Sequence, residues 1–115
     1  MGEGQLYKIV IAKPAIIRYQ ETVLLYLYDN FTFDRAAEID KNIIDRAGTL
    51  SHKPARGRRE KYLSEAKEDF RFILYKEAKH FEVKIIYYIN EEESIVYITD
   101  FFPTKMHPQR ISDHH

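Results

Sequence analysis

Two strand-like segments of this sequence carry cations and phenols at alternate positions. In Phe70–Glu77 and Phe81–Asn90, valine, isoleucine, tyrosine and phenylalanine predominate, as is typical of half-buried strands. Because side chains alternate between the two faces of a strand, one face of the pair should form the core. That core set is Phe70, Phe72, Leu74, Phe81, Val83, Ile85, Tyr87 and Ile89. The opposite set, which we interpret as the candidate functional face, is Arg71, Ile73, Tyr75, Lys84, Ile86 and Tyr88.

Arg71 and Lys84 are the two cations of this candidate functional face. On one face they could converge on a single phosphate group, which is the chemistry that guanidinium and ammonium groups suit best. A simpler interpretation remains open, because exposed Arg and Lys are commonplace on the solvated side of a sheet. Tyr75 and Tyr88 add hydroxyl groups, although cross-strand packing is the simpler role for both rings. His107 is a further titratable candidate, or simply part of a turn.

The end of the chain contains groups that could bind a metal ion. The sequence has no cysteine, so a zinc ion would have to use His, Asp or Glu. His107, Asp113, His114 and His115 have suitable groups, but they lie in a terminal tail without a rigid ligand spacing. We therefore expect no metal site, and no other motif predicts a cofactor.

Composition limits the class of protein. The chain of 115 residues, with 44% hydrophobic and 31% charged residues, predicts one globular domain spanning residues 1–115. Its 18 basic and 18 acidic side chains cancel, so nucleic-acid binding would depend on a local patch. The first four residues lack the features of a signal peptide, and the longest apolar run, Thr22–Tyr28, is too short to span a membrane. We expect a soluble cytoplasmic protein with no membrane partner.

Hydrophobic spacing predicts the elements that position these side chains. Apolar residues at helical spacing predict two helices, Ala15–Asp29 and Phe33–Leu50, and Thr32 is a suitable N-cap for the second. Because the link between them is short, the helices should form an antiparallel hairpin. A strand is predicted before them, at Gln5–Ala12, and another at Ile95–Phe102.

The connections complete the predicted fold. Gaps at Ala78–His80 and Glu91–Ser94 have the lengths of antiparallel hairpin loops, and a polar tail follows at about 109–115. In Ser51–Asp69 the basic side chains are followed closely by acidic ones, so a solvated connection is a simpler interpretation than an RNA-binding arm. The prediction is an α+β domain of order β-α-α-β-β-β, with an antiparallel sheet and a helical hairpin packed on one face.

Three local features, in this order of elements, carry a resemblance. The first is Pro54-Ala-Arg-Gly57, which follows the second helix. The second is Phe70-Arg71-Phe72 followed by Val83-Lys84-Ile85-Ile86-Tyr87, and the third is Phe102-Pro103-Thr104-Lys105-Met106-His107-Pro108. Together they resemble the proline–glycine connection, the paired strands with a basic residue and then an aromatic, and the C-terminal ending of the RelE/ParE family of toxins. The likeness covers about Leu6 to Ile111 and implies the RelE/ParE-like version of this fold.

The resemblance also implies a function. Members of the family are toxins of bacterial type II toxin–antitoxin, or plasmid-stabilisation, modules. They inhibit growth until a cognate antitoxin wraps them with an extended or helical tail. RelE-like members cut messenger RNA in the ribosomal decoding site, ParE-like members inhibit DNA gyrase by binding it, and several members have lost activity. All three alternatives remain open here, and without its antitoxin the chain could form a homodimer.

The resemblance implies site residues for the RNA-cutting alternative. Cleaving RNA through its own 2′-hydroxyl requires a base, an acid and cations around the phosphate. Arg71 stands where these members have a catalytic lysine, and Lys84 and Lys105 stand at arginine positions. Tyr88 and His107 are the remaining candidates for acid or base.

The sequence also departs from the RNA-cutting pattern. Pro103 replaces a frequent histidine and Ile73 a second lysine, so the catalytic set is incomplete. Ile73, Tyr75 and Ile86 are predicted to bind the antitoxin or target, because exposed apolar side chains on a sheet face call for a partner.

Overall fold

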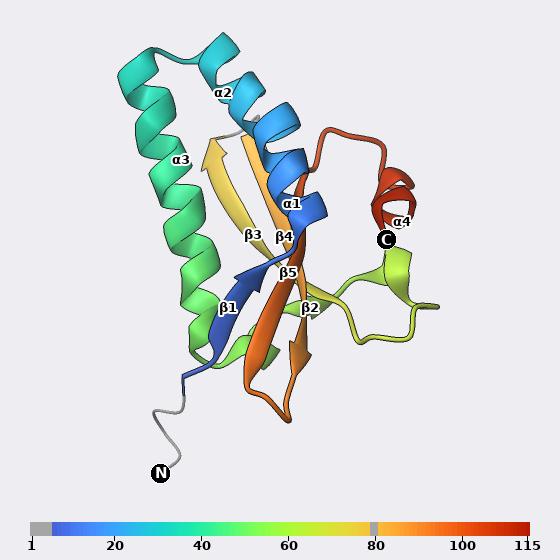
Figure 1. Ribbon diagram of the computed structural model, residues 1–115. Helices are drawn as coiled ribbons and strands as arrows, with labels where there is room; N and C mark the ends of the chain where they lie inside the picture. Colours follow the sequence, from blue (N-terminus) through green and yellow to red (C-terminus); the bar gives the residue numbers. More distant parts are fainter. Residues whose placement is uncertain (1–5, 79–80) are drawn as a thin grey trace.

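The computed structural model, which describes residues 6–78 and 81–115, is an α+β fold (Figure 1). The parts of the predicted first strand at Gln5 and of the predicted loop at residues 79–80 lie outside the described residues. In chain order the elements are β1 (Lys8–Ile11), α1 (Lys13–Arg18), the π-helical segment η1 (Tyr19–Leu24), α2 (Leu25–Asn30), α3 (Phe33–Gly48), the 3-10 turns η2 (Thr49–Ser51) and η3 (Pro54–Arg56), β2 (Arg58–Arg59), the 3-10 turn η4 (Lys61–Leu63), β3 (Arg71–Ala78), β4 (Phe81–Asn90), β5 (Ile95–Pro103) and α4 (Arg110–His114).

The predicted helical hairpin is confirmed. Its first arm runs continuously through α1, η1 and α2, with Pro14 in the first turn, where its missing N–H costs nothing. Thr32 caps the second arm, α3, because its hydroxyl accepts the Arg35 N–H at 3.2 Å. The Tyr19 hydroxyl donates to Asp40 and ties the two arms together. The predicted buried stripe of the second helix is Ala36, Ile39, Ile43, Ala47 and Leu50, and all of these are buried.

The sheet is mixed, and this corrects the prediction of an antiparallel sheet. Its order is β1-β5-β4-β3-β2, so the last strand in the sequence lies between the first strand and β4. The hairpins β3–β4 and β4–β5 are antiparallel as predicted, whereas β1 pairs with β5 in parallel. The parallel pair arises because the chain leaves β1 through the helical hairpin, a crossover connection, before it re-enters the sheet.

One face of the sheet, which we call the helical face, packs against α1, η1, α2 and α3 (Figure 1). Phe81, Val83, Ile85 and Tyr87 of β4 lie in this core, as predicted. On the neighbouring strand the core contains Ile73 rather than Phe72.

The other face, which we call the tail face, is also covered, and the sequence did not predict this cover. Leu63 of η4 and Ile111 of α4 pack with Ile86 and Phe102 in a second buried cluster. The C-terminal stretch therefore contains a short helix with a fully buried isoleucine, and the expectation of a plain polar tail at 109–115 is wrong. Apolar side chains on both faces of the sheet need a cover on both faces.

Arg18 connects α1 to the tail face. β1 ends at Ile11, opposite Ile98, so no described strand lies beside the later residues of β5 on that side. The Arg18 guanidinium donates to the Asp100 carboxylate, with Nε 3.1 Å from Oδ1, and to the Arg110 carbonyl at 3.5 Å. The buried side chain of Arg18 therefore joins the helical hairpin, β5 and α4.

The register of β3 corrects the predicted faces of that strand. Arg71 lies opposite Tyr87, and Ile73 lies opposite Ile85. Directly opposite residues in an antiparallel pair share a face, so Arg71, Ile73 and Tyr75 lie on the helical face. The assignment made from the sequence is wrong by one residue on β3 and right on β4, and it follows that Arg71 and Lys84 lie on opposite faces.

Candidate functional site

Arg71 lies on the helical face beside the turn η3. Its Nη1 donates to the carbonyl oxygens of Ala55 at 3.2 Å and Gly57 at 2.9 Å, and its Nη2 lies 3.2 Å from Oδ2 of Asp69. Only 20% of the side chain is exposed. These contacts hold the guanidinium inward, where it fixes the Pro54–Gly57 connection to the sheet.

The Tyr87 hydroxyl fixes the same connection from the core. It donates to the Pro54 carbonyl and accepts the Gly57 N–H at 3.1 Å. Burial raises the pKa of this phenol, although the Gly57 N–H and the nearby charge of Arg71 oppose the rise. A side chain at Gly57 would collide with the hydroxyl and lie 2.8 Å from the Phe72 carbonyl oxygen, so the close approach requires glycine. The proline–glycine motif therefore has a structural role in this chain.

Lys84 lies on the tail face and is held by a buried carboxylate. Its Nζ is 2.8 Å from Oε1 of Glu60, and the side chains are 17% and 0% exposed. Glu60 also accepts the Tyr62 N–H at 3.1 Å, and the Lys84 ammonium sits 4.4 Å from the ring centroid of Phe72. The lysine charge is thus balanced within the fold by an ion pair and by an aromatic face.

The two tyrosine candidates are also on opposite faces. The Tyr88 ring stacks on Tyr97, with centroids 5.3 Å apart, and meets Phe70 edge-on at 5.4 Å. Burial and then the negative charge of Glu68 raise the pKa of Tyr88, which disfavours the phenolate that a base would need. Tyr75, on the helical face, donates its hydroxyl to Glu77. Tyr88 therefore packs across strands, as the simpler interpretation describes, and Tyr75 packs against the core of the helical face.

Lys105 and His107 lie in the turns that follow β5. The Lys105 ammonium is 5.7 Å from the ring centroid of Tyr26, on the first arm of the helical hairpin. His107 is exposed, and its Nδ1 accepts the Gln109 N–H at 3.4 Å. Among the described residues we find no hydrogen bond or ion pair from either side chain to Arg71 or Lys84.

The five candidate catalytic residues are not brought into one site. The sequence predicted that Arg71 and Lys84 would share a face and converge on a phosphate, and the strand register shows that this is wrong. Each cation is instead held against acceptors of the fold itself. Within the part of the chain that the structure describes, we find no arrangement of acid, base and cations around a common point.

The predicted apolar contact positions are likewise inside the molecule. Ile73 is 6% exposed under the helices, and Ile86 is fully buried under η4 and α4. The expectation that these two side chains form one exposed face is therefore wrong. Both faces of the strands are apolar here because both are covered.

Among the side chains that the structure describes, which do not include that of His114, there is no group of three that could bind a metal ion. Over residues 6–78 and 81–115, none of the helices has the length and apolar character that crossing a bilayer requires.

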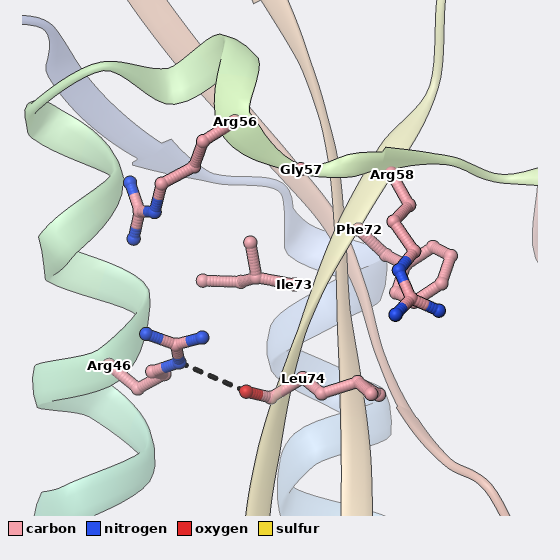
Figure 2. Close-up of a pocket in the computed structure, with 7 residues that line it drawn as sticks. All are labelled: Arg46, Arg56, Gly57, Arg58, Phe72, Ile73 and Leu74. Carbon is pink, nitrogen blue, oxygen red and sulfur yellow. Dashed lines mark hydrogen bonds between the residues drawn. The ribbon is translucent and has the colours of Figure 1, made fainter.

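A cleft at the edge of β3 is the feature that sequence reasoning missed. We call it the arginine cleft; it is lined by Arg46, Arg56, Gly57, Arg58, Phe72, Ile73 and Leu74 (Figure 2). Three guanidinium groups from α3, η3 and β2 border it, and no acidic residue lines it. Arg46 donates from Nε to the Leu74 carbonyl at 2.9 Å, and Arg56 donates to the carbonyls of Thr49 and His52.

The charges that seemed to cancel in the sequence are separated in space. Glu60 follows Arg58 closely in the chain, but its carboxylate points to Lys84 on the tail face. Asp69 pairs with Arg59 and Arg71 rather than with the residues of the cleft. The arginine cleft thus keeps a net positive charge in a chain that is neutral overall. The signal in the sequence was the spacing of Arg56 and Arg58, which places basic groups on either side of Gly57.

Fold and site together define an α+β domain with a five-stranded mixed sheet and a basic cleft at one sheet edge. Comparison with protein-family models, curated proteins and solved structures finds no significant match.

Proposed function

We propose that this protein is the toxin of a toxin–antitoxin pair and that it inhibits growth by binding a protein, with DNA gyrase the first target to test. Two features support the toxin assignment. The first is the order strand, helical hairpin, three long strands, with only the two-residue β2 in addition. The second is the Pro54–Gly57 connection that Tyr87 and Arg71 hold. Both belong to the resemblance with the RelE/ParE family.

The observation that carries the choice of mechanism is the separation of Arg71 and Lys84 on opposite faces of the sheet. Cleavage of RNA needs preorganised cations around one phosphate together with an acid and a base. Releasing Lys84 for such a role would leave the Glu60 carboxylate buried without its partner, which is costly. Binding to a protein surface needs none of these groups to move.

The proposal includes a neutralising partner protein in the same compartment, the cytoplasm. The partner would cover the surface that the toxin uses, and the arginine cleft is a basic surface of suitable kind for an acidic segment. Without this partner, the chain would be free to associate with itself.

The test combines growth and biochemistry. The chain is induced in a bacterial host alone or together with the neighbouring gene, and the purified protein is added to a DNA supercoiling reaction and to a translating-ribosome reaction. We expect growth arrest that the neighbouring gene relieves, loss of supercoiling, and intact message. Message cleavage with normal supercoiling would overturn the binding mechanism, and no arrest at full expression would point to a non-toxic homologue.

A matched variant makes the test sharper. Replacing both partners of the tail-face ion pair, with Lys84→Met and Glu60→Leu, removes the candidate catalytic cation without leaving a buried charge. We expect the double variant to arrest growth like the parent. An inactive double variant that is nevertheless folded would favour a catalytic role for Lys84.

A further inference from the structure

The edge of β3 beside the arginine cleft is largely unpaired. β2 pairs with β3 only through Arg58 and Arg59, opposite Phe72 and Arg71, so no described strand lies beside the remainder of β3. The Leu74 carbonyl points away from β4, because it accepts from Arg46 of α3. Backbone groups on a strand alternate in direction, so Lys76 also directs its N–H and carbonyl outward. Open edges of this kind can accept another strand.

The three guanidinium groups straddle this edge (Figure 2). Arg46 and Arg56 lie on the side of β3 where Ile73 points toward α3, whereas Arg58 lies on the other side, next to Phe72. Positive charge therefore flanks the edge on both faces of the sheet. Arg58 is exposed, and we find no acceptor for its guanidinium among the described residues.

We infer that the arginine cleft is a docking site for a short extended acidic segment of a partner protein, which adds a strand to the edge of β3 in line with β2. Side chains of an added strand alternate between the faces, so two consecutive acidic residues would meet Arg46 or Arg56 on one face and Arg58 on the other. The backbone of the segment would bond to Leu74 and Lys76. Only the identity of the partner, the neutralising protein, rests on the proposed function.

An extended peptide fits this geometry better than a nucleic acid does. A single phosphate group cannot contact guanidinium groups on the two opposite faces of a strand. A peptide strand reaches both faces and also satisfies the outward backbone groups, which is the mode of recognition known as β-augmentation. Carboxylates match the planar donor fork of arginine in a bidentate manner.

In the absence of a partner, Arg46 also blocks the open edge of β3. It occupies the Leu74 carbonyl that an added strand would use. An acidic side chain of the segment draws the guanidinium to itself and leaves the carbonyl to the segment's backbone N–H. Further along the edge, the ion pair between Arg35 and Glu77 ties α3 to β3 and sets the end of the available stretch. The site is therefore short, from about Phe72 to Lys76.

The test uses the isotope-labelled full-length chain and a synthetic peptide of valine and threonine with two adjacent central glutamates. We expect chemical-shift changes in the Leu74 and Lys76 amides and slowed hydrogen exchange at both. The double variant Arg46→Gln, Arg58→Gln should weaken binding by at least about tenfold, since it removes a charge-assisted contact on each face. Arg110→Gln, a substitution of an exposed arginine on α4, is the matched control and should leave affinity unchanged.

Two control peptides decide what is recognised. A peptide with lysine in place of both glutamates and one with an N-methylated backbone should both fail to bind. Equal binding of the N-methylated peptide would overturn strand addition, and absence of shifts at Leu74 and Lys76 at millimolar peptide would overturn the site. Tighter binding of a single-stranded oligonucleotide in the same cleft would replace the peptide by a nucleic acid. These measurements do not depend on growth arrest, so the docking site and the proposed toxicity can fail separately.

Discussion

At Gly57 the fold leaves no room for a side chain. A β-carbon there would collide with the Tyr87 hydroxyl, which is hydrogen-bonded to the Pro54 carbonyl, and would press on the Phe72 carbonyl. We expect Gly57→Ala to lower the free energy of unfolding by about 1–3 kcal/mol, the usual cost of overpacking. Urea denaturation measures the change.

Gly48 provides the matched control for this substitution. It ends α3 with a helical φ of −64°, and nothing lies within 4 Å of a β-carbon placed there. Gly48→Ala should therefore leave stability unchanged or raise it by about 0.5–1 kcal/mol, because alanine loses less backbone freedom on folding. Equal losses in the two variants would contradict the Tyr87 clamp.

The buried hydroxyl of Tyr19 should make the stability of the protein depend on pH in the alkaline range. Burial, followed by the hydrogen bond to Asp40 and its negative charge, raises the pKa of Tyr19 far above the ordinary tyrosine value of 10.0. The unfolded chain therefore releases this proton at a lower pH than the folded chain does. The stabilisation is complete below pH 10.0 and is lost as the pH rises above it.

We expect the free energy of unfolding to fall above this pH, and to fall less steeply in Tyr19→Phe, which has no phenolic proton at that position. The measurement is denaturant unfolding across a series of alkaline buffers. Tyr62→Phe removes a hydroxyl from an exposed ring of η4 and is the comparison variant. A slope that is the same in the parent and in Tyr19→Phe would count against this assignment.

At the scale of elements, the ion pair between Glu60 and Lys84 joins η4 to β4. Lys84→Met leaves the fully buried Glu60 carboxylate without its cation and should cost about 3 kcal/mol or more. The double variant with Glu60→Leu should recover most of this loss, because it removes both charges. A double-mutant cycle of unfolding free energies measures the coupling, and a value near zero would show that the pair does not hold η4 in place.

The β3 strand shows where sequence reasoning succeeds and where it stops. Helical spacing located both arms of the hairpin, and the capping role of Thr32 followed from its position before an apolar stripe. The four longer strands were equally clear from their composition, whereas the two-residue β2 fell in a segment predicted to be a connection. The face of β3 was not, because Phe72 and Ile73 are both apolar and both faces of the sheet are covered. A shift of one residue then reverses every side chain, and only pairing with β4 decides it.

The same limit applies to the candidate site. The sequence indicated the basic residues, but the side chains that balance them came from distant or opposite surfaces. Glu60 neutralises Lys84 rather than its neighbour Arg59, and Arg46 joins the arginine cleft from a different element. Net charge along the chain does not give net charge at a point in space.

At the scale of the whole molecule, α4 acts as the cover of the tail face. Ile111 is fully buried, and it packs against Ile86, Phe102 and Leu63. Ile111→Ala should destabilise the protein by about 2–4 kcal/mol through the cavity it leaves, and should raise binding of a hydrophobic dye. Ile44→Ala, at an exposed position on α3, should change stability by less than about 0.5 kcal/mol.

A loss of stability in Ile111→Ala as small as that in Ile44→Ala would show that α4 is only loosely attached. The contact of Arg18 with Asp100 and the Arg110 carbonyl argues for firm attachment, since it fixes α4 to the helical hairpin across the edge of β5.

The position of β5 has a consequence for the timing of biosynthesis. This strand is made after β1, β3 and β4, yet it lies between β1 and β4 and contributes Ile98 and Phe101 to the core. A growing chain on the ribosome can form its helices and the β3–β4 hairpin, but it cannot close the sheet until Ile95–Pro103 has emerged from the exit tunnel. Chains released before that point would lack a stable interior, so whatever this protein does is confined to molecules whose translation has run past β5.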